Sequence, residues 1–182
     1  MLSTFSGSFK FGRRPPVIQG GGNMVTSNLL FSLDSTQYSG SGTSWPDSTD
    51  HSPTNNFTLS GSPPWTSGSS GYFNFTSGST MRAQSPNNIM SNNLAAYTKA
   101  LLFQPPSLIA PPGDAMSSLS DTGPCFRIIS TAASAGNSGT TVITYSNSFS
   151  SSKWYYLIVT FDSTLGSNNW KFYLNGNQTP VA

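Results

Sequence analysis

Acidic residues are scarce in this sequence of 182 residues, which contains no glutamate and in which only 8% of the residues are charged. Helix surfaces usually carry Glu and Lys, so a chain with so little charge is a poor candidate for an α-helical fold. Any carboxylate chemistry, in catalysis or in metal binding, would have to use aspartates. The aspartates are Asp34, Asp47, Asp50, Asp114, Asp121 and Asp162.

Cysteine and histidine each occur once, as Cys125 and His51. A single cysteine cannot form an intrachain disulfide, and in the strand-like run CFRIIS it is predicted to be a small core residue. A Cys–His zinc site needs several such ligands. A Ser-His-Asp triad is disfavoured because no G-x-S-x-G motif accompanies the histidine.

Long hydrophobic runs and broad basic clusters are also missing. No segment approaches the ~20 apolar residues of a membrane-spanning helix, and residues 1–20 lack the apolar region of a secretory signal. We therefore expect no membrane partner. Of the eight Lys and Arg residues, Lys10, Arg13 and Arg14 lie close together near the N-terminus. Three charges are a small electrostatic footprint, so we expect no nucleic-acid partner either.

Serine, threonine, asparagine and glycine separate short apolar runs throughout the chain, and aromatic residues make up 13% of it. That aromatic content argues against disorder, and short runs bounded by turn residues are typical of strands. We expect about eight to eleven strands in an antiparallel two-sheet sandwich. The expected strands comprise residues 27–34, 56–60, 71–76, 80–83, 94–104, 124–130, 140–145, 154–161 and 170–174.

Two of these assignments depend on neighbouring residues. A helix is possible for Asn92 to Lys99, but Pro105-Pro106 after residues 94–104 and the surrounding strands favour a strand. The strands at 124–130 and 140–145 are predicted to be joined by a turn rich in Gly, Ala and Ser, and Pro111-Pro112-Gly113 predicts a loop.

The clearest pattern lies between Lys153 and Gly176, where two strand patterns follow each other. The first is apolar on both faces, which predicts a strand covered on both sides. The second alternates and predicts a half-buried strand. Asn175-Gly176 then predicts a type I′ turn, because both of its central residues need a positive φ.

Residues 1–26 are expected to form an extended arm, because Gly and Pro interrupt them and no hydrophobic period survives. Within the arm, three aromatic and three basic residues are spaced so that they could dock on another chain. These residues are Phe5, Phe9, Phe11, Lys10, Arg13 and Arg14.

The order of motifs over residues 27–177 resembles concanavalin A-like, laminin-G-like jelly rolls. Members of that group often begin with a strand ending in Leu-Asp, followed by Tyr, Gly-x-Gly, Trp-x-Asp and a Phe-x-Phe pair. The corresponding residues here are Leu33-Asp34, Tyr38, Gly40 and Gly42, Trp45 and Asp47, and Phe73 and Phe75. The later segments 153–162 and 172–176 resemble the hairpin of the same group.

This resemblance implies a jelly-roll domain over residues 27–182, with the arm preceding it. Two features depart from the group. Residues 48–53 replace its usual Ser-Gly-x-Gly, and the strands that normally follow Asn-Gly would be missing after Asn175-Gly176. We therefore expect the first strand, Asn28 to Asp34, to be left with an open edge. Either residues 94–104 or, preferably, a neighbouring subunit would cover it, which predicts a homo-oligomer.

The opening block looks most like versions in tail, neck and capsid-associated proteins of tailed bacteriophages. It implies a non-enzymatic protein displayed on the virion and held to other virion proteins by the arm. The composition of an exposed protein without an export signal is consistent with release by cell lysis. One alternative is a lectin-like glycan-binding module, on the virion or extracellular, and another is a glycoside-active enzyme of the same fold.

Candidate binding residues lie in the loops. Trp45, Trp65 and Tyr38 could stack on a sugar ring, although a tryptophan there could equally anchor its loop to the sandwich. Asp47 and Asp50 could hold calcium with loop carbonyls, although aspartates in such loops often form Asx turns. Beside His51 they are also the one candidate for a catalytic cluster. We expect no other cofactor and no enzymatic activity.

Overall fold

A computed structural model describes residues 9–11, 30, 32–49, 55–67, 71–75, 82–85, 95–105, 113–117, 125–129, 131–137, 140–177 and 179–181. Apart from two 3-10 turns, every element in these residues is a β-strand, and all strand pairs are antiparallel. The elements are β1 (Phe9–Phe11), η1 (Ser35–Gln37), β2 (Ser44–Trp45), β3 (Phe57–Ser60), β4 (Trp65–Thr66), β5 (Tyr72–Phe75), β6 (Arg82–Gln84), β7 (Ala96–Gln104), β8 (Gly113–Ser117), β9 (Cys125–Ile129), β10 (Ala132–Asn137), β11 (Thr140–Ser146), β12 (Tyr155–Asp162), η2 (Ser163–Leu165) and β13 (Trp170–Leu174).

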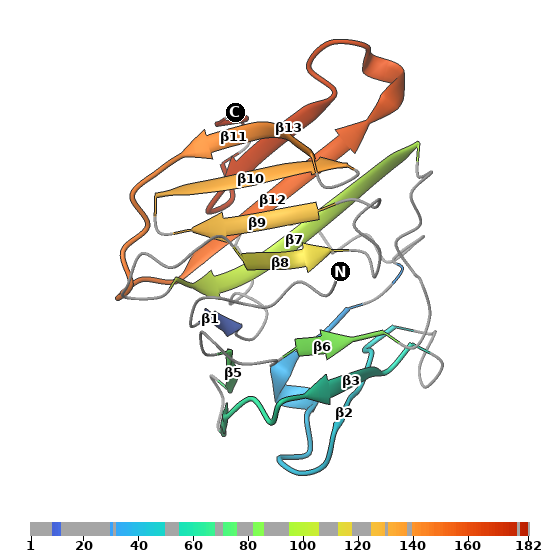
Figure 1. Ribbon diagram of the computed structural model, residues 1–182, viewed down its shortest axis with the longest axis vertical. Coiled ribbons are helices and arrows are strands. Elements are labelled where there is room, and N and C mark those ends of the chain that lie inside the picture. The colour runs from blue at the N-terminus through green and yellow to red at the C-terminus, as the bar shows by residue number, and fades with distance from the viewer. Residues whose placement is uncertain are drawn as a thin grey trace.

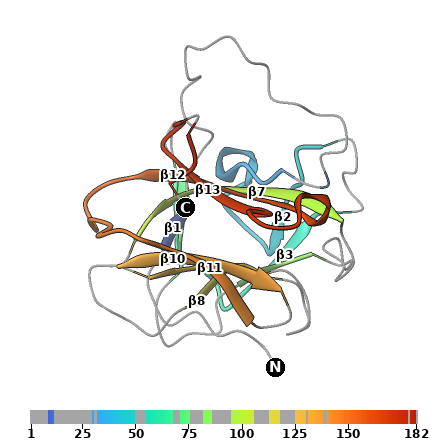
Figure 2. The same cartoon turned by 90° about the horizontal axis from the view of Figure 1, so that it is seen from above.

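The strands form three sheets. Six strands are ordered β13-β12-β7-β1-β5-β4, four are ordered β11-β10-β9-β8, and three are ordered β2-β3-β6. The four-stranded sheet lies in front of β7, β12 and β13 in Figure 1, and Figure 2 shows the two sheets as separate layers. The three-stranded sheet lies beyond them, near β5 (Figure 1). The prediction of an all-β protein with antiparallel sheets is confirmed.

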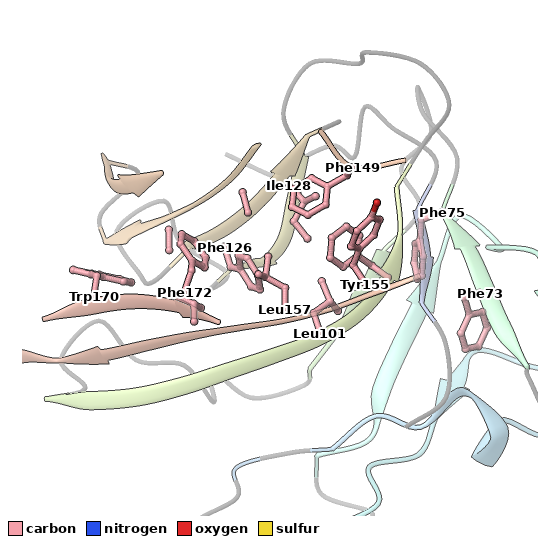
Figure 3. Close-up of a cluster of buried hydrophobic side chains, with 14 of the residues drawn as sticks. Phe73, Phe75, Leu101, Phe126, Ile128, Phe149, Tyr155, Leu157, Trp170 and Phe172 are labelled. Carbon is pink, nitrogen blue, oxygen red and sulfur yellow. The ribbon is translucent and has the colours of Figure 1, made fainter. Parts of the chain in front are cut away.

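The core lies between the two larger sheets. Phe126 and Ile128 from β9 face Leu157 and Phe172 from the opposite sheet (Figure 3), and all four are at most 1% exposed. The rings of Phe126 and Phe172 have centroids 6.0 Å apart. Burial of these large side chains removes their apolar area from water, which is the main favourable term in holding two sheets together.

The strand β12 is buried on one face and half-buried on the other. Tyr155, Leu157 and Val159 face the core, whereas Tyr156 and Ile158 face away from it and keep part of their surface exposed. The prediction that both faces are covered is therefore right only for the inner face. Full burial of the outer face would need a third layer on this side of the sheet.

The turn after β13 has the predicted geometry. Asn175 and Gly176 have φ values of 51° and 80°, and the Asn177 N–H donates to the Leu174 carbonyl at 3.0 Å. Positive φ at both central residues is the requirement of a type I′ turn. The Val181 N–H then donates to the Phe172 carbonyl at 2.8 Å, so the C-terminal segment lies along the outer edge of β13.

Residues 96–104 form a strand, as expected, and this strand lies in the middle of its sheet between β12 and β1. Lys99, Leu101 and Phe103 are buried on its inner face. The Lys99 ammonium lies 5.3 Å from the centroid of the Tyr97 ring, where the ring quadrupole attracts a cation. The strand is therefore central to the fold and does not fold back to cover an edge.

The prediction of a turn between residues 130 and 140 is wrong. Ala132–Asn137 is the strand β10, which lies between β9 and β11. Ala133 and Ala135 are completely buried on its inner face, and their neighbours in register include Ile128 and Phe126 on one side. Small residues at the middle of this sheet leave room for large side chains from both sides. Packing, not intrinsic strand preference, selects the strand here.

The loop predicted around Pro111-Pro112-Gly113 is also shorter than expected, because Gly113 already begins β8. This strand pairs with β9, and its register shifts between Asp114 and Met116. A bulge of this kind interrupts the alternation that a sequence pattern can reveal. The segment 113–117 therefore carried no periodic signal.

The prediction of an arm separate from the domain is wrong for residues 9–11. They form β1, whose backbone pairs with β5 on one side and with β7 on the other. The register places Phe9 opposite Phe75, and Lys10 opposite both Asn74 and Gln104. Backbone ladders on both sides hold this segment within the domain. Docking of its side chains on another chain stays a prediction. Phe5, Arg13 and Arg14 lie outside the described residues.

The predicted first strand also differs from the expectation. Of its residues, Leu33 makes only an isolated bridge to Asp47, and Leu30 is 40% exposed. Residues 32–34 therefore do not form an open edge of a large sheet. Coverage of the predicted first strand by a neighbouring subunit stays a prediction. Leu29 and Phe31 lie outside the described residues.

The position of β1 gives a first prediction. Lys10→Pro removes a backbone donor from a strand that has a neighbour on each side, while Lys10→Ala keeps the donor. We expect the proline variant to lose about 1–3 kcal/mol of unfolding free energy, the cost of a buried group left without its hydrogen bond. Denaturant unfolding of both variants measures this loss. Equal stability of the two variants would contradict the placement of β1 in the sheet.

Candidate functional site

The loop aromatic residues that the sequence singled out come together around one core residue. The centroid of the Phe73 ring, on β5, lies 4.5 Å from that of Trp45 and 4.9 Å from that of Tyr38. The Tyr38 ring lies edge-on to Trp65 at 5.5 Å. We call Tyr38, Trp45, Trp65 and Phe73 the Phe73 cluster. Trp45 and Trp65, expected in loops, lie in the short strands β2 and β4, so three strands and the loop that carries Tyr38 converge at this end of the six-stranded sheet.

Trp45 has a structural role in this cluster. Its side chain is only 5% exposed, and its indole N–H donates to the Asp34 carbonyl at 3.0 Å. A ring that stacks on a sugar must present a face to solvent, and the Trp45 ring is covered instead. These contacts favour the alternative of a loop anchor, and glycan binding by Trp45 stays a prediction.

Trp65 and Tyr38 are half-buried, and their polar atoms are bonded to the chain itself. The Trp65 indole N–H donates to the Ser35 carbonyl at 3.2 Å, and the Tyr38 hydroxyl donates to the Gly42 carbonyl at 2.6 Å. Gly40, at φ +84°, brings its backbone so close to the Trp65 ring that a Cβ there would lie 3.0 Å away. The loop after η1 therefore wraps around Trp65. Sugar binding by these two residues stays a prediction.

Asp47 joins two segments of chain. It is 3% exposed, and its Oδ1 accepts hydrogen bonds from the backbone N–H groups of Ser32 at 2.8 Å and Thr49 at 3.1 Å. Its Oδ2 accepts from the Thr49 hydroxyl at 2.6 Å. Both oxygens of the carboxylate are thus occupied by protein donors in a buried position. The arrangement is that of an Asx turn with a long-range hydrogen bond added.

The same local structure occurs three times with one sequence, Asp-Ser-Thr, at residues 34–36, 47–49 and 162–164. Asp34 Oδ1 accepts from the Thr36 N–H at 2.9 Å and from its hydroxyl at 2.7 Å. Asp162 Oδ1 accepts from the corresponding groups of Thr164 at 2.9 and 2.6 Å. The sequence reasoning missed this repeat, although the recurring tripeptide could have revealed it. Half of the six aspartates therefore stabilise turns.

Two of these turns start a 3-10 turn directly, because Asp34 caps η1 and Asp162 caps η2. The hydrogen bond from the Thr164 hydroxyl, followed by that from its backbone N–H, lowers the pKa of the Asp162 carboxyl. Hydrogen bonds to the ionised form favour that form. The charged state of Asp162 is therefore tied to the geometry of the turn between β12 and β13.

The other predicted metal ligand, Asp50, lies outside the described residues, as does His51. Among the residues that the structure describes, no group of three or more His, Cys, Asp or Glu side chains is placed to hold a metal ion. A calcium site at Asp50 stays a prediction. At Asp47, a cation would have to compete with three hydrogen bonds that the carboxylate already accepts.

An aromatic surface that the sequence reasoning did not single out lies on the outer face of the six-stranded sheet. Trp154 is 39% exposed, and its ring lies edge-on to Tyr72 with centroids 5.9 Å apart. Tyr156 and Tyr173 lie on the same outer face and are half-buried. We call these four residues the outer aromatic face. Partial burial raises the pKa of the Tyr156 hydroxyl, because it disfavours the charged form.

The sequence carried a signal for this surface. Trp154, Tyr156 and Ile158 alternate along the chain, so the strand pattern places all three side chains on the same face of the sheet.

The described residues contain no helix with the length and hydrophobicity of a membrane span.

Comparison with protein-family models, with curated proteins and with solved structures gave no match. Functional conclusions therefore rest on the residues of this chain and on the order of its motifs.

The role of Asp47 gives a second prediction. Asp47→Ala removes a buried acceptor from two partly buried N–H groups and a hydroxyl, so we expect it to lose about 2 kcal/mol of unfolding free energy. Asp162→Ala, in the same tripeptide near the surface, should lose less. Thermal unfolding of both variants, with calcium and with a chelator, measures the difference. Calcium-dependent stabilisation of the wild type that disappears in Asp47→Ala would show that Asp47 is a metal ligand instead.

Proposed function

We propose that this chain is a non-enzymatic structural protein of a bacteriophage particle, displayed on the capsid, neck or tail and built on a jelly roll of the concanavalin A-like kind. The observation that carries the proposal is the convergence of the motif residues. Leu33 bridges Asp47, the Trp45 indole donates to Asp34, and the Trp45 ring packs on Phe73. Motifs far apart in the sequence thus form one packed unit, which supports the resemblance on which the virion assignment depends.

The use of the acidic residues also supports a structural role. Asp34, Asp47 and Asp162 each accept hydrogen bonds from a threonine two residues later. A catalytic carboxylate needs a proton-transfer or nucleophilic role with access to a substrate. These three carboxylates instead complete turns, as the loops of a display scaffold require.

The proposal predicts that the chain copurifies with virus particles. Particles from the source culture would be separated on a density gradient, and each fraction analysed by quantitative mass spectrometry. A structural protein should peak with the major capsid protein at a constant ratio, because it is held in the particle at fixed copy number. A chain found only in particle-free fractions would contradict the proposal and leave an extracellular protein.

Glycan binding is a second candidate function, and the outer aromatic face favours it. Trp154 presents a partly exposed ring beside Tyr72. In the same sheet, Asn74 of β5 and Gln104 of β7 lie on either side of β1, each opposite Lys10, and the Gln104 amide donates to the Ser151 carbonyl. Aromatic rings bury large apolar areas at little cost in conformational entropy, and amides supply hydrogen bonds. A surface with such rings suits the apolar faces of pyranose sugars.

This second candidate predicts that a single side chain controls binding. On an array of bacterial surface polysaccharides, Trp154→Ala should weaken binding about five- to thirtyfold, since an exposed stacking ring contributes on the order of 1–2 kcal/mol. Leu165→Ala, which also truncates an exposed apolar residue, should bind as the wild type does. Binding that both variants retain would exclude the outer aromatic face as the site.

A further inference from the structure

The outer edges of the three sheets differ in how they are protected from pairing with another chain. The edge strands β2 and β4 have two residues each, and β6 has three. The edge strand β8 contains a register shift, and the edge of β13 is met by the Val181 N–H, which donates to the Phe172 carbonyl. Short strands, bulges and covering segments are the usual means by which proteins keep an edge from extending.

The sixth edge strand, β11, has little of this protection. It has seven residues, contains no charge and no proline, and lies at the upper edge of the front sheet in Figure 1. A register shift leaves Val142 as an extra residue near its start, but pairing from Ile143 to Ser146 is regular. No strand in the described part of the chain pairs with its outer side.

The hydrogen-bond pattern shows which backbone groups of β11 point outward. Beyond its end, the Asn147 N–H donates to the Thr131 carbonyl, so this is a hydrogen-bonded pair. In an antiparallel ladder such pairs alternate with pairs that are not hydrogen-bonded. Tyr145 therefore bonds to β10, whereas Thr144 and Ser146 direct their N–H and C=O groups away from it. Both residues are exposed.

We propose that β11 pairs antiparallel with β11 of a second copy of this chain, which joins two four-stranded sheets into one continuous sheet. In a two-fold arrangement the same strand meets itself, so Thr144 would lie opposite Thr144 or Ser146 of the other copy. Each outward N–H then finds an outward C=O. The Val142 side chain, 56% exposed beside this edge, becomes partly covered.

Charge favours a second copy as the partner. No Asp, Glu, Lys, Arg or His occurs between Ile128 and Ser152. Like charges placed opposite each other across two strands are destabilising, and a strand that pairs with itself always places like beside like. An uncharged edge avoids this repulsion. The proposal concerns assembly alone and does not rest on the virion assignment.

Sedimentation velocity of the purified chain at micromolar concentrations tests the proposal. We expect the wild type to sediment as a dimer. Thr144→Lys places two ammonium groups close together at the joined edge and should weaken the dimer at least about 100-fold, since opposed like charges cost several kcal/mol. Thr58→Lys adds the same charge at an exposed position of β3 and should leave the dimer unchanged.

Hydrogen exchange of the wild type gives a test that needs no variant. The Thr144 and Ser146 amides should exchange more slowly as protein concentration rises, whereas the amides of the exposed residues 165–168 should not change. A monomeric wild type, a dimer that persists in Thr144→Lys, equal weakening by Thr58→Lys, or concentration-independent exchange at Thr144 and Ser146 would each overturn the proposal.

Discussion

The packing of two β-sheets on a shared apolar core is the interaction on which the rest of this structure depends. Large side chains such as Phe172 and Leu157 on the six-stranded sheet need space between the two sheets. The small side chains of Ala133 and Ala135, in the middle of the facing sheet, leave that space. With β12 buried on its inner face, β7 and β13 are held on its two sides. The sheet then continues through β1 to β5, where the Phe73 ring contacts the rings of Tyr38 and Trp45.

Outside that core, few charged side chains are present to satisfy the polar groups of the loops. Long loops contain many backbone N–H groups, and a buried one costs free energy unless it finds an acceptor. Aspartates of a repeated tripeptide supply such acceptors, as Asp47 does for the Ser32 N–H. Loop carbonyls in turn find donors in indole N–H groups, as the Asp34 carbonyl does in Trp45. Among the described residues, Asp34, Asp47 and Asp162 therefore hold turns in place.

The sequence predicted the elements whose own residues determine them. The alternating aromatic strands at 155–162 and 170–174 and the Asn175-Gly176 turn carry strong local signals, and all three are present. The strand β10 could not be predicted, because alanine and glycine favour a strand only when large neighbours need the space. The strand β1 was hidden among Gly and Pro, since its pairing is set by distant β5 and β7.

The residues of the candidate site could be predicted, but their exposure could not. Trp45, Trp65 and Tyr38 do lie together. Trp45 is buried because it packs on Phe73, and no local sequence pattern connects these two residues.

The most direct test of the account is a nuclear Overhauser spectrum of the folded chain. It predicts cross-peaks between the ring protons of Phe172 and those of both Phe126 and Tyr145, whose centroids lie 6.0 and 6.5 Å away. A well-resolved spectrum without these contacts would contradict face-to-face packing of the two sheets.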